Sequence, residues 1–354
     1  MDTFRGVAVL WVILHHSNLF FDMQKWLGRS FVWFDKIANI GFLGVDMFFV
    51  ISGFLITGIL IEGFEQDIRV KRFYLRRCFK ILPQYGLALL AGIFISYGLP
   101  YFYAGPLTNY DKDASVGSYF IFAQNFSKPI PVLAHTWSLA VEEHFYLFYP
   151  LLLFGIFRFQ KTPLRRRQWL MTILMVFIFI VNVIRIIWVN KTIPPVVVVQ
   201  TTFYRIDALV FGCLLKILEP HIVPPANGKR IPLAAFNFLI LGMLIYSYFL
   251  ASGASDRLWY TYTFAYLAPG AILVAALKGL DRFFDNGFFR WIGKNSYGIY
   301  LWHYILVFPL MKTGVVYPVW KGVVLFIGVS ILAGWMSTVT VERYFLNLRK
   351  KIVP

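Results

Sequence analysis

The chain has 354 residues, of which 59% are hydrophobic, 19% are aromatic and only 14% are charged. A soluble domain carries about 25% charged residues, so this composition excludes an ordinary soluble protein and predicts a polytopic membrane protein. The net charge of +17 is carried mostly by short loops between apolar segments. We therefore attribute this charge to membrane topology and expect no nucleic-acid partner.

Hydropathy predicts an all-α membrane bundle of about ten transmembrane helices. Alternate sorting of the loops places most Lys and Arg on the side of the N-terminus, which predicts that both termini are cytoplasmic. We expect 1–354 to form a single integral-membrane domain with no appended soluble domain. The predicted spans lie near 5–23, 38–61, 82–103, 137–157, 169–189, 201–218, 232–251, 259–277, 296–311 and 318–341.

The first span carries Arg5 at its start and the pair His15 and His16 well inside an apolar run. Ionisable side chains in a spanning helix are rare and usually face the bundle interior. At 1.5 Å per residue, Arg5 and His16 lie about 16 Å apart along the helix axis. This spacing predicts a cation at one membrane face and an imidazole near the midplane.

Ionisable residues on three further spans are predicted to lie at a depth similar to that of His16. Because each of them would be costly facing lipid, they predict a shared polar cavity, although buried hydrogen-bonding between helices is the alternative. The three are Asp46, Glu142 and His303.

A histidine just before the fourth predicted span and a serine, a carboxylate and a tyrosine within it are predicted to share one helix face, because they follow one another at i+3 and i+4 spacing. A carboxylate and an imidazole in an apolar site tune each other's pKa, as acid/base chemistry requires. The four residues are His135, Ser138, Glu142 and Tyr146.

Two basic stretches lie in the loops that are predicted to be cytoplasmic. Arg76, Arg77 and Lys80 stand in a dense cationic segment that could clamp phosphate, while a positive-inside signal that binds lipid headgroups is the alternative. The run Arg165–Arg167 is interpreted as a topology signal, and Arg185 is expected to snorkel from the outer end of its span.

Three further features complete the interpretation. Segment 201–218 is the least regular, because it contains Arg205 and Asp207, and it is either a full span or a re-entrant segment. The outer loop 104–136 is rich in aromatic residues and is expected either to contact a ligand or to form an interfacial belt. Metal-binding, serine-hydrolase and P-loop motifs are missing from the sequence, so no metal is predicted.

In six stretches that contain the residues described above, the sequence resembles the acyltransferase-3 family of membrane proteins, which acylate surface polysaccharides and related glycans. The resemblance covers the whole chain in the family's order. The matching stretches are Arg5 with ten residues to His16, GFLGVDMFFVISGFLI around Asp46 and Ser52, RFYLRRCFKILP from Arg72, WSLAVEEHFY from Trp137, YRIDAL from Tyr204, and IGKNSYGIYLWH ending at His303.

The resemblance implies an acyl-CoA donor from the cytoplasm and functional positions at Arg5, His16, Ser138 and Glu142. His144 departs from the family, which more often has Gln there. A second departure is the expectation that no hydrolase-like domain follows the last span. The remaining polar positions are expected to line a supporting cavity, namely Asp46, Ser52, Arg205, Asp207, Tyr297 and His303.

These inferences combine into a hypothesis for the reaction. Acetyl-CoA binds at the inner face, with its phosphates near Arg5, Arg76, Arg77 and Lys80, and no cofactor is permanently bound. His16 is the general base on an acceptor hydroxyl, and Glu142 orients it or stabilises its imidazolium form. Transfer through a covalent acyl-histidine stays open.

The expected acceptor is a saccharide or glycolipid hydroxyl at the cell surface, and the expected location is a bacterial plasma (inner) membrane. Association with the lipid bilayer follows from the spans, and an oligomer is left open. The alternative from another class is a proton-coupled transporter or exporter, since buried His, Glu and Asp also form proton relays.

Overall fold

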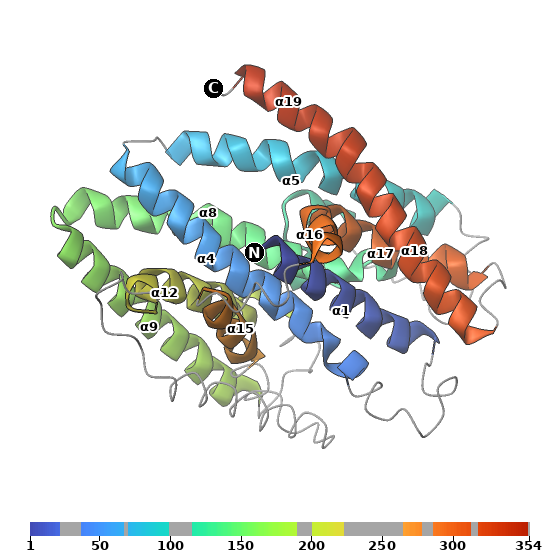
Figure 1. Cartoon of the computed structure of the whole chain (residues 1–354), viewed down its shortest axis with the longest axis horizontal. Helices are drawn as coiled ribbons and strands as arrows, with labels where there is room; N and C mark the ends of the chain where they lie inside the picture. Colours follow the sequence, from blue (N-terminus) through green and yellow to red (C-terminus); the bar gives the residue numbers. More distant parts are fainter. Residues whose placement is uncertain are drawn as a thin grey trace. The chain divides into compact units, whose positions relative to one another are not determined.

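The structure is a computed structural model that describes residues 1–21, 37–66, 70–98, 115–189, 200–222, 265–277, 286–312 and 318–352. Over these ranges the secondary structure is helical, with short 3-10 and π segments and no strand (Figure 1). In the described ranges, six helices are long and apolar enough to cross a membrane: Asp2–Phe21, Ile37–Glu65, Val70–Gly98, Pro131–Phe159, Pro163–Ile187 and Val319–Ile352.

These helices coincide with the first five predicted spans and with the last, so the all-α prediction is confirmed for the described residues. The total of about ten spans and the cytoplasmic location of both termini stay predictions. Of the other four predicted spans, 232–251 lies outside the described residues. Within 259–277 the structure describes α15 (Leu267–Leu277), and 296–311 corresponds to the 17-residue α17 (Ser296–Lys312).

The irregular segment 201–218 is two helices. The first is α11 (Thr202–Arg205), and the second is α12 (Asp207–Ile222), with a turn at Ile206 between them. The 16 residues of α12 reach about 24 Å at 1.5 Å per residue, which is less than a hydrocarbon core of about 30 Å.

The contacts divide the chain into two compact units. Apart from Met1, unit 1 contains Leu43–Val70 and Val141–Asn286, while unit 2 contains Asp2–Phe42, Lys71–Ala140 and Gly287–Pro354. The helix α8 (Trp137–Phe159) begins in unit 2 and continues in unit 1.

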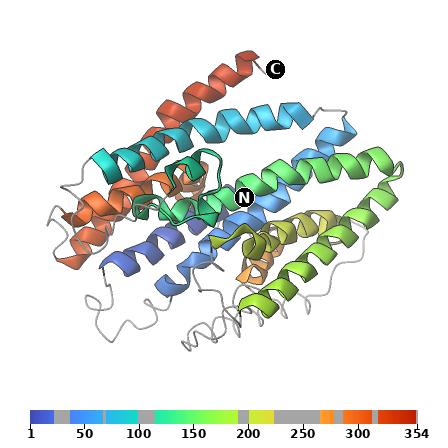
Figure 2. The ribbon, with the colours of Figure 1, turned by 180° about the vertical axis from the view of Figure 1, so that it is seen from behind.

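Unit 1 is built around the crossing of α4 (Leu43–Glu65) and α12. The backbones meet at two glycines: a Cβ on Gly53 would lie 1.9 Å from the carbonyl oxygen of Leu209, and one on Gly212 would lie 2.1 Å from that of Val50. Close approach at small residues is how membrane helices gain packing energy without a hydrophobic driving force between them. Helix α9 (Pro163–Val189) follows α8 after a short turn, and the two are drawn in green in Figure 2.

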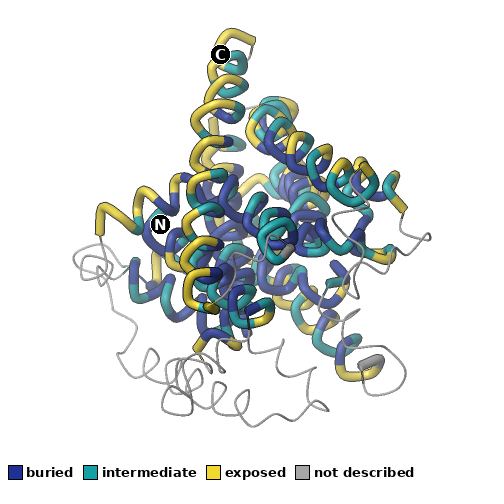
Figure 3. The backbone as a smooth tube through the Cα atoms, turned by 90° about the vertical axis from the view of Figure 1, so that its right-hand side faces the viewer, coloured by how far each residue is buried: buried dark blue, intermediate teal, exposed yellow. Residues whose placement is uncertain are grey.

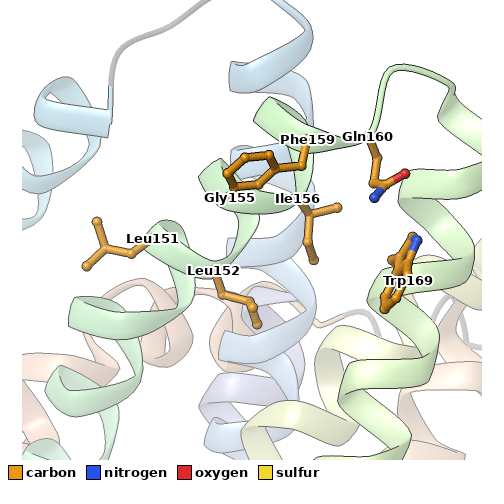
Figure 4. A pocket seen from close by; sticks show the side chains of 7 residues that line it. All are labelled: Leu151, Leu152, Gly155, Ile156, Phe159, Gln160 and Trp169. Atoms are coloured by element: carbon orange, nitrogen blue, oxygen red, sulfur yellow. The ribbon is translucent and has the colours of Figure 1, made fainter.

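A groove of about 290 Å³ lies between α8 and α9 in unit 1 (Figure 4). It is apolar apart from one amide side chain, and none of the predicted site residues lines it. The lining residues are Leu151, Leu152, Gly155, Ile156, Phe159, Gln160 and Trp169.

Unit 2 holds α1 (Asp2–Phe21), which packs against α16 (Gly287–Lys294), α17 and α18 (Val319–Ser337). A Cβ on Gly6 of α1 would lie 2.1 Å from the carbonyl oxygen of Phe289 of α16. This close approach fixes the helix that carries His16. Helix α5 (Val70–Ile93) also belongs largely to this unit. The C-terminal α19 (Arg343–Ile352) contains no buried residue, and its exposed turns are visible near the C-terminus in Figure 3.

The described part of the 104–136 loop is held by its own hydrogen bonds. It contains α7 (Val116–Phe120) and the 3-10 turns Gln124–Phe126 and Pro131–Thr136. Tyr119 is fully buried, its hydroxyl accepts a 2.8 Å bond from the Ile130 backbone N–H, and its carbonyl accepts one of 2.9 Å from the Tyr85 hydroxyl. Burial raises the pKa of Tyr119 to about 12, so the phenol stays neutral and is structural at physiological pH.

Candidate functional site

Two histidines that lie far apart in the sequence meet in unit 2. His16, in the fourth turn of α1, and His303, in the middle of α17, place Nδ1 of His16 3.1 Å from Nε2 of His303. His303 is fully buried, whereas His16 is half-buried. The structure thus brings together two of the four residues for which the sequence predicts a shared polar cavity, and the cavity itself stays a prediction.

The contacts of His303 assign a proton position to both rings. Nδ1 of His303 lies 2.6 Å from the carbonyl oxygen of Tyr300, and a carbonyl can only accept, so this nitrogen carries a hydrogen. In a neutral imidazole the other nitrogen, Nε2, is then an acceptor. Nδ1 of His16 therefore donates to it, and the lone pair of His16 is on Nε2.

The backbone of α1 is consistent with this assignment. The carbonyl of Val12, one turn before His16, also interacts with the His16 ring. Nδ1 is the ring nitrogen nearer to the histidine's own backbone, so the N–H that faces His303 is the one that can serve this second acceptor as well. A proton-accepting nitrogen on a half-buried side chain is what a general base requires.

Tyr300 connects this histidine pair to the start of α8. Its hydroxyl donates to the carbonyl oxygen of His135 at 2.9 Å, and lies 2.6 Å from the hydroxyl of Ser138. A tyrosine has one hydroxyl hydrogen, so Ser138 donates to Tyr300. Ser138 is 4% exposed, and its hydroxyl also lies 3.4 Å from the carbonyl oxygen of His135. Ser138 thus belongs to a hydrogen-bond network with Tyr300 and His135, and its catalytic role stays a prediction.

His135 completes a cluster of aromatic rings around the pair. Its Nε2 lies 3.1 Å from the carbonyl oxygen of Leu301, its ring stacks on Tyr304 at 5.0 Å, and its centroid is 5.3 Å from that of His303. Tyr304 also meets the ring of His16 edge to face at 4.9 Å. These rings form an apolar wall that fixes the orientation of the His16 imidazole.

The prediction that His135 shares an α-helical face with Ser138 is wrong in detail. His135 belongs to the 3-10 helix Pro131–Thr136, and α8 begins only at Trp137. Pro131 is the first residue of that 3-10 helix, where its missing N–H costs no hydrogen bond.

Glu142 follows Ser138 by one turn on α8 and belongs to unit 1. Its Oε1 accepts a hydrogen bond from Ser52 at 3.3 Å, and its Oε2 accepts one from Tyr146 at 3.1 Å. The i+4 bond from Tyr146 confirms the predicted shared face. The neighbouring His144 bonds through Nδ1 to the hydroxyl of Thr202 at 2.7 Å, a contact that the family's more common Gln could also make.

Two buried ion pairs hold α4, α9 and the α11–α12 turn together in unit 1. Arg205 donates to Asp46 at 2.8 Å, and Arg185 donates to Asp207 at 2.7 Å, and each of the four side chains is at most 2% exposed. Asp46, Arg205 and Asp207 thus have partners that account for their burial. Their membership of a catalytic cavity stays a prediction.

The prediction that Arg185 snorkels is wrong. The side chain is fully buried, and it also donates to the carbonyl oxygen of Tyr204. The sequence contained the acidic partner, Asp207, but it stands 22 residues later, at the start of a helix whose position relative to α9 only the fold decides.

A second polar cluster in unit 2 contains three of the predicted donor-binding cations. Lys80 of α5 has charge–charge interactions with Arg77, with Arg5 of α1 and with Glu342. Glu342 accepts a 2.5 Å bond from Gln84. Sequence reasoning missed both Gln84 and Glu342, since neither stands in an obvious motif. Arg76 is exposed on α5, and Tyr297 donates to the carbonyl oxygen of Ile81 at 3.2 Å.

Among the described residues, no group of three or more His, Cys, Asp or Glu side chains is placed so that it could hold a metal ion. The contact between His16 and His303 suits proton transfer, and unit 2 also holds a cationic cluster on α1 and α5.

Comparison with known proteins gives a family match over nearly the whole chain. Residues 1–339 match the family model described as an acyltransferase domain. The chain is 28% identical over 333 residues to the Peptidoglycan O-acetyltransferase OatA of Listeria monocytogenes, a match covering 87% of the chain and 49% of the relative. It is 29% identical over 370 residues to the Putative peptidoglycan O-acetyltransferase YrhL of Bacillus subtilis, covering 97% of the chain and 54% of that relative.

A third relative is the O-acetyltransferase OatA of Staphylococcus aureus, which is 30% identical over 329 residues, covering 87% of the chain and 50% of the relative. The chain thus spans about half the length of the curated relatives it matches. No solved structure matches the chain.

Proposed function

Because the chain belongs to the acyltransferase family whose domain it matches over residues 1–339, we propose that it is a membrane-embedded O-acetyltransferase. The observation that carries the proposal is the half-buried His16, whose Nδ1 is engaged by His303 and whose Nε2 holds a lone pair. The family model and the six apolar helices in the described ranges make the chain an integral membrane protein. A bacterial plasma membrane is part of the proposal.

The reaction begins when His16 Nε2 takes the proton of an acceptor hydroxyl. The hydroxyl oxygen attacks the acetyl carbonyl carbon, the carbon–sulfur bond of the thioester breaks, and the sulfur leaves as the CoA thiolate. The proton on His16 then passes to that thiolate. A variant with an acetyl group held on His16 Nε2 uses the same lone pair as a nucleophile. Glu142, expected from the sequence to orient His16 or to stabilise its imidazolium form, stays a predicted site residue.

Acetyl-CoA is the proposed donor, bound from the cytoplasm without any permanent cofactor. Lys80 has charge–charge interactions with both Arg5 and Arg77, and such a group of cations suits the diphosphate and ribose phosphate of the nucleotide. Arg76 stays a proposed fourth contact. The carboxylates of Glu342 and Asp2 limit the repulsion at Lys80 before the donor arrives.

The proposed acceptor is a hydroxyl of a cell-surface polysaccharide, and the names of the relatives favour peptidoglycan. The test is transfer of radiolabelled acetyl groups from acetyl-CoA to peptidoglycan fragments, measured with the purified chain in proteoliposomes. We expect an alkali-labile label on the glycan. Proton-coupled movement of glycan without any label would favour the transporter alternative and contradict the proposal.

Removal of the cationic side chains tests the donor site. We expect Arg77→Ala and Lys80→Ala each to raise the KM for acetyl-CoA by about tenfold or more, because a charge-assisted hydrogen bond contributes roughly 1.5–3 kcal/mol. The kcat should change little, since the phosphates bind alike in the ground and transition states. Steady-state kinetics in inside-out vesicles measure both constants.

Acetyl-pantetheine, which lacks the nucleotide, supplies the internal comparison. The wild type should use it poorly, and Arg77→Ala should use it almost as well as the wild type does. Arg165→Ala is the matched control, because it removes an exposed arginine from the first turn of α9, at an end of the helix also predicted to be cytoplasmic. Equal losses with both donors in Arg77→Ala would make the cationic cluster a topology signal.

A further inference from the structure

We propose that His303 is a positioning residue that holds His16 in the tautomer with hydrogen on Nδ1, and that Tyr300 anchors His303 for this task. The inference rests on the proposed function, because it assigns His303 to the reaction that His16 performs. It also gives Ser138 a role through Tyr300 rather than at the reacting atoms.

His16 and His303 differ in burial and in how many of their ring nitrogens are hydrogen-bonded. Both ring nitrogens of His303 are engaged, by the carbonyl of Tyr300 and by His16, and its side chain is fully buried. His16 is half-buried and uses Nδ1 toward His303. A substrate hydroxyl can therefore approach His16 but not His303, so the base and its orienting partner are distinguished by burial.

Without a partner, a neutral imidazole exchanges its hydrogen between the two nitrogens, and only the form with a free Nε2 can act as the base here. The Tyr300 carbonyl fixes the hydrogen of His303 on Nδ1, and this leaves Nε2 of His303 as an acceptor. That acceptor fixes the hydrogen of His16 on Nδ1. A base oriented by a third group in this way is the general logic of hydrogen-bonded catalytic relays.

The hydrogen bond from His16 to His303 also favours the protonated state of His16 that forms during acetyl transfer. When His16 takes up the acceptor's proton on Nε2, its Nδ1–H bond to the neutral His303 becomes charge-assisted and therefore stronger. The interaction strengthens as charge develops, so its loss should lower kcat rather than raise the KM for the donor.

Tyr300 makes the geometry rigid because it is tied down at two points. Its side chain bonds to the carbonyl of His135 and to the hydroxyl of Ser138, while its own carbonyl bonds to His303. Ser138 thus holds the tyrosine whose carbonyl sets the tautomer. The spacing of Tyr300 and His303 by three residues on α17 places this carbonyl under the imidazole.

The test uses the full chain in lipid nanodiscs, with 15N-labelled histidine and solid-state NMR. The signals of His16 are identified by their loss in His16→Gln. In the wild type we expect a protonated Nδ1 and an unprotonated Nε2. The pattern should persist in His303→Gln, because the amide oxygen of Gln can accept at the position of Nε2. In His303→Leu the form of His16 with hydrogen on Nε2 should appear.

Kinetics add a second measurement. His303→Leu should lower kcat by at least about tenfold, since an unoriented base loses part of the 10²–10⁴-fold that general base catalysis supplies, while the KM for acetyl-CoA stays within about twofold. His303→Gln should recover much of the kcat. His15→Gln is the matched control, because His15 bonds through Nδ1 to the carbonyl of Ala38 instead.

The outcomes separate this inference from the proposed function. A proton on Nε2 of His16 in the wild type, or an unchanged tautomer in His303→Leu, would overturn the positioning role. If the tautomers behave as expected but the wild type transfers no acetyl group to any glycan, the proposed function fails and the positioning role stands.

Discussion

Replacement of His16 by Gln is expected to abolish acetyl transfer while the chain still folds. Gln can keep a hydrogen bond to His303 through its amide group, but it cannot take a proton from an acceptor hydroxyl. Loss of a general base should lower kcat by about 10²- to 10⁴-fold. Transfer of labelled acetyl groups in proteoliposomes measures the loss, and thermal unfolding in detergent measures the fold.

His15→Gln is the control for this change. His15 is adjacent on α1 and carries the same ring, but it bonds to Ala38 in the segment before η2 (Ile40–Phe42). A helix turns about 100° per residue, so His15 faces a different neighbour. His15→Gln should retain most of the activity. An equal loss at His15 and His16 would make both residues structural, and substantial activity in His16→Gln would remove it as the base.

Replacement of Asp46 by Leu is expected to destabilise the fold strongly. Asp46 and Arg205 are 1% and 2% exposed and their charged groups are 2.8 Å apart, so Leu would leave the Arg205 guanidinium buried without its partner. Loss of one partner of a buried pair lowers the free energy of unfolding by about 3–5 kcal/mol. Unfolding of the chain by SDS in mixed micelles measures this free energy.

Two controls show whether the cost comes from the orphaned charge. The double variant Asp46→Leu/Arg205→Leu removes both charges and should recover much of the loss. Glu219→Leu breaks the pair with Lys216, whose side chains are 25% and 29% exposed, and should change the free energy of unfolding by no more than about 1 kcal/mol. If Asp46→Leu and Glu219→Leu cost the same, the ion pairs of unit 1 do not hold its helices together.

The sequence by itself determined that the chain is a helical membrane protein, because long apolar runs allow no other way to satisfy the backbone in lipid. It also marked His16 and His303 as unusual, since an ionisable residue in such a run needs a reason to be there. Local periodicity was enough for contacts within one helix, such as the bond from Tyr146 to Glu142.

Periodicity was not enough to predict the helix boundaries where the backbone departs from a regular α-helix. The 3-10 turn that carries His135 departs from the α-helix that the i+3 spacing of His135 and Ser138 predicted, and the break at Ile206 interrupts a run that hydropathy reads as continuous. Hydropathy averages over a window, whereas a turn depends on a few residues whose backbone groups find partners elsewhere in the fold.

Only the tertiary structure decided which polar groups are paired. Arg185 was expected at the interface, yet Asp207 gives it a buried partner, and Glu342 meets Gln84 from 258 residues away. Such pairs depend on which helices are neighbours, and that choice is set by close approaches such as the one at Gly53 and Gly212. The tautomer of His16 follows from the same cause. The ring hydrogen of His16 lies on Nδ1 because the acceptor that faces this nitrogen is Nε2 of His303, and His303 belongs to another helix, α17.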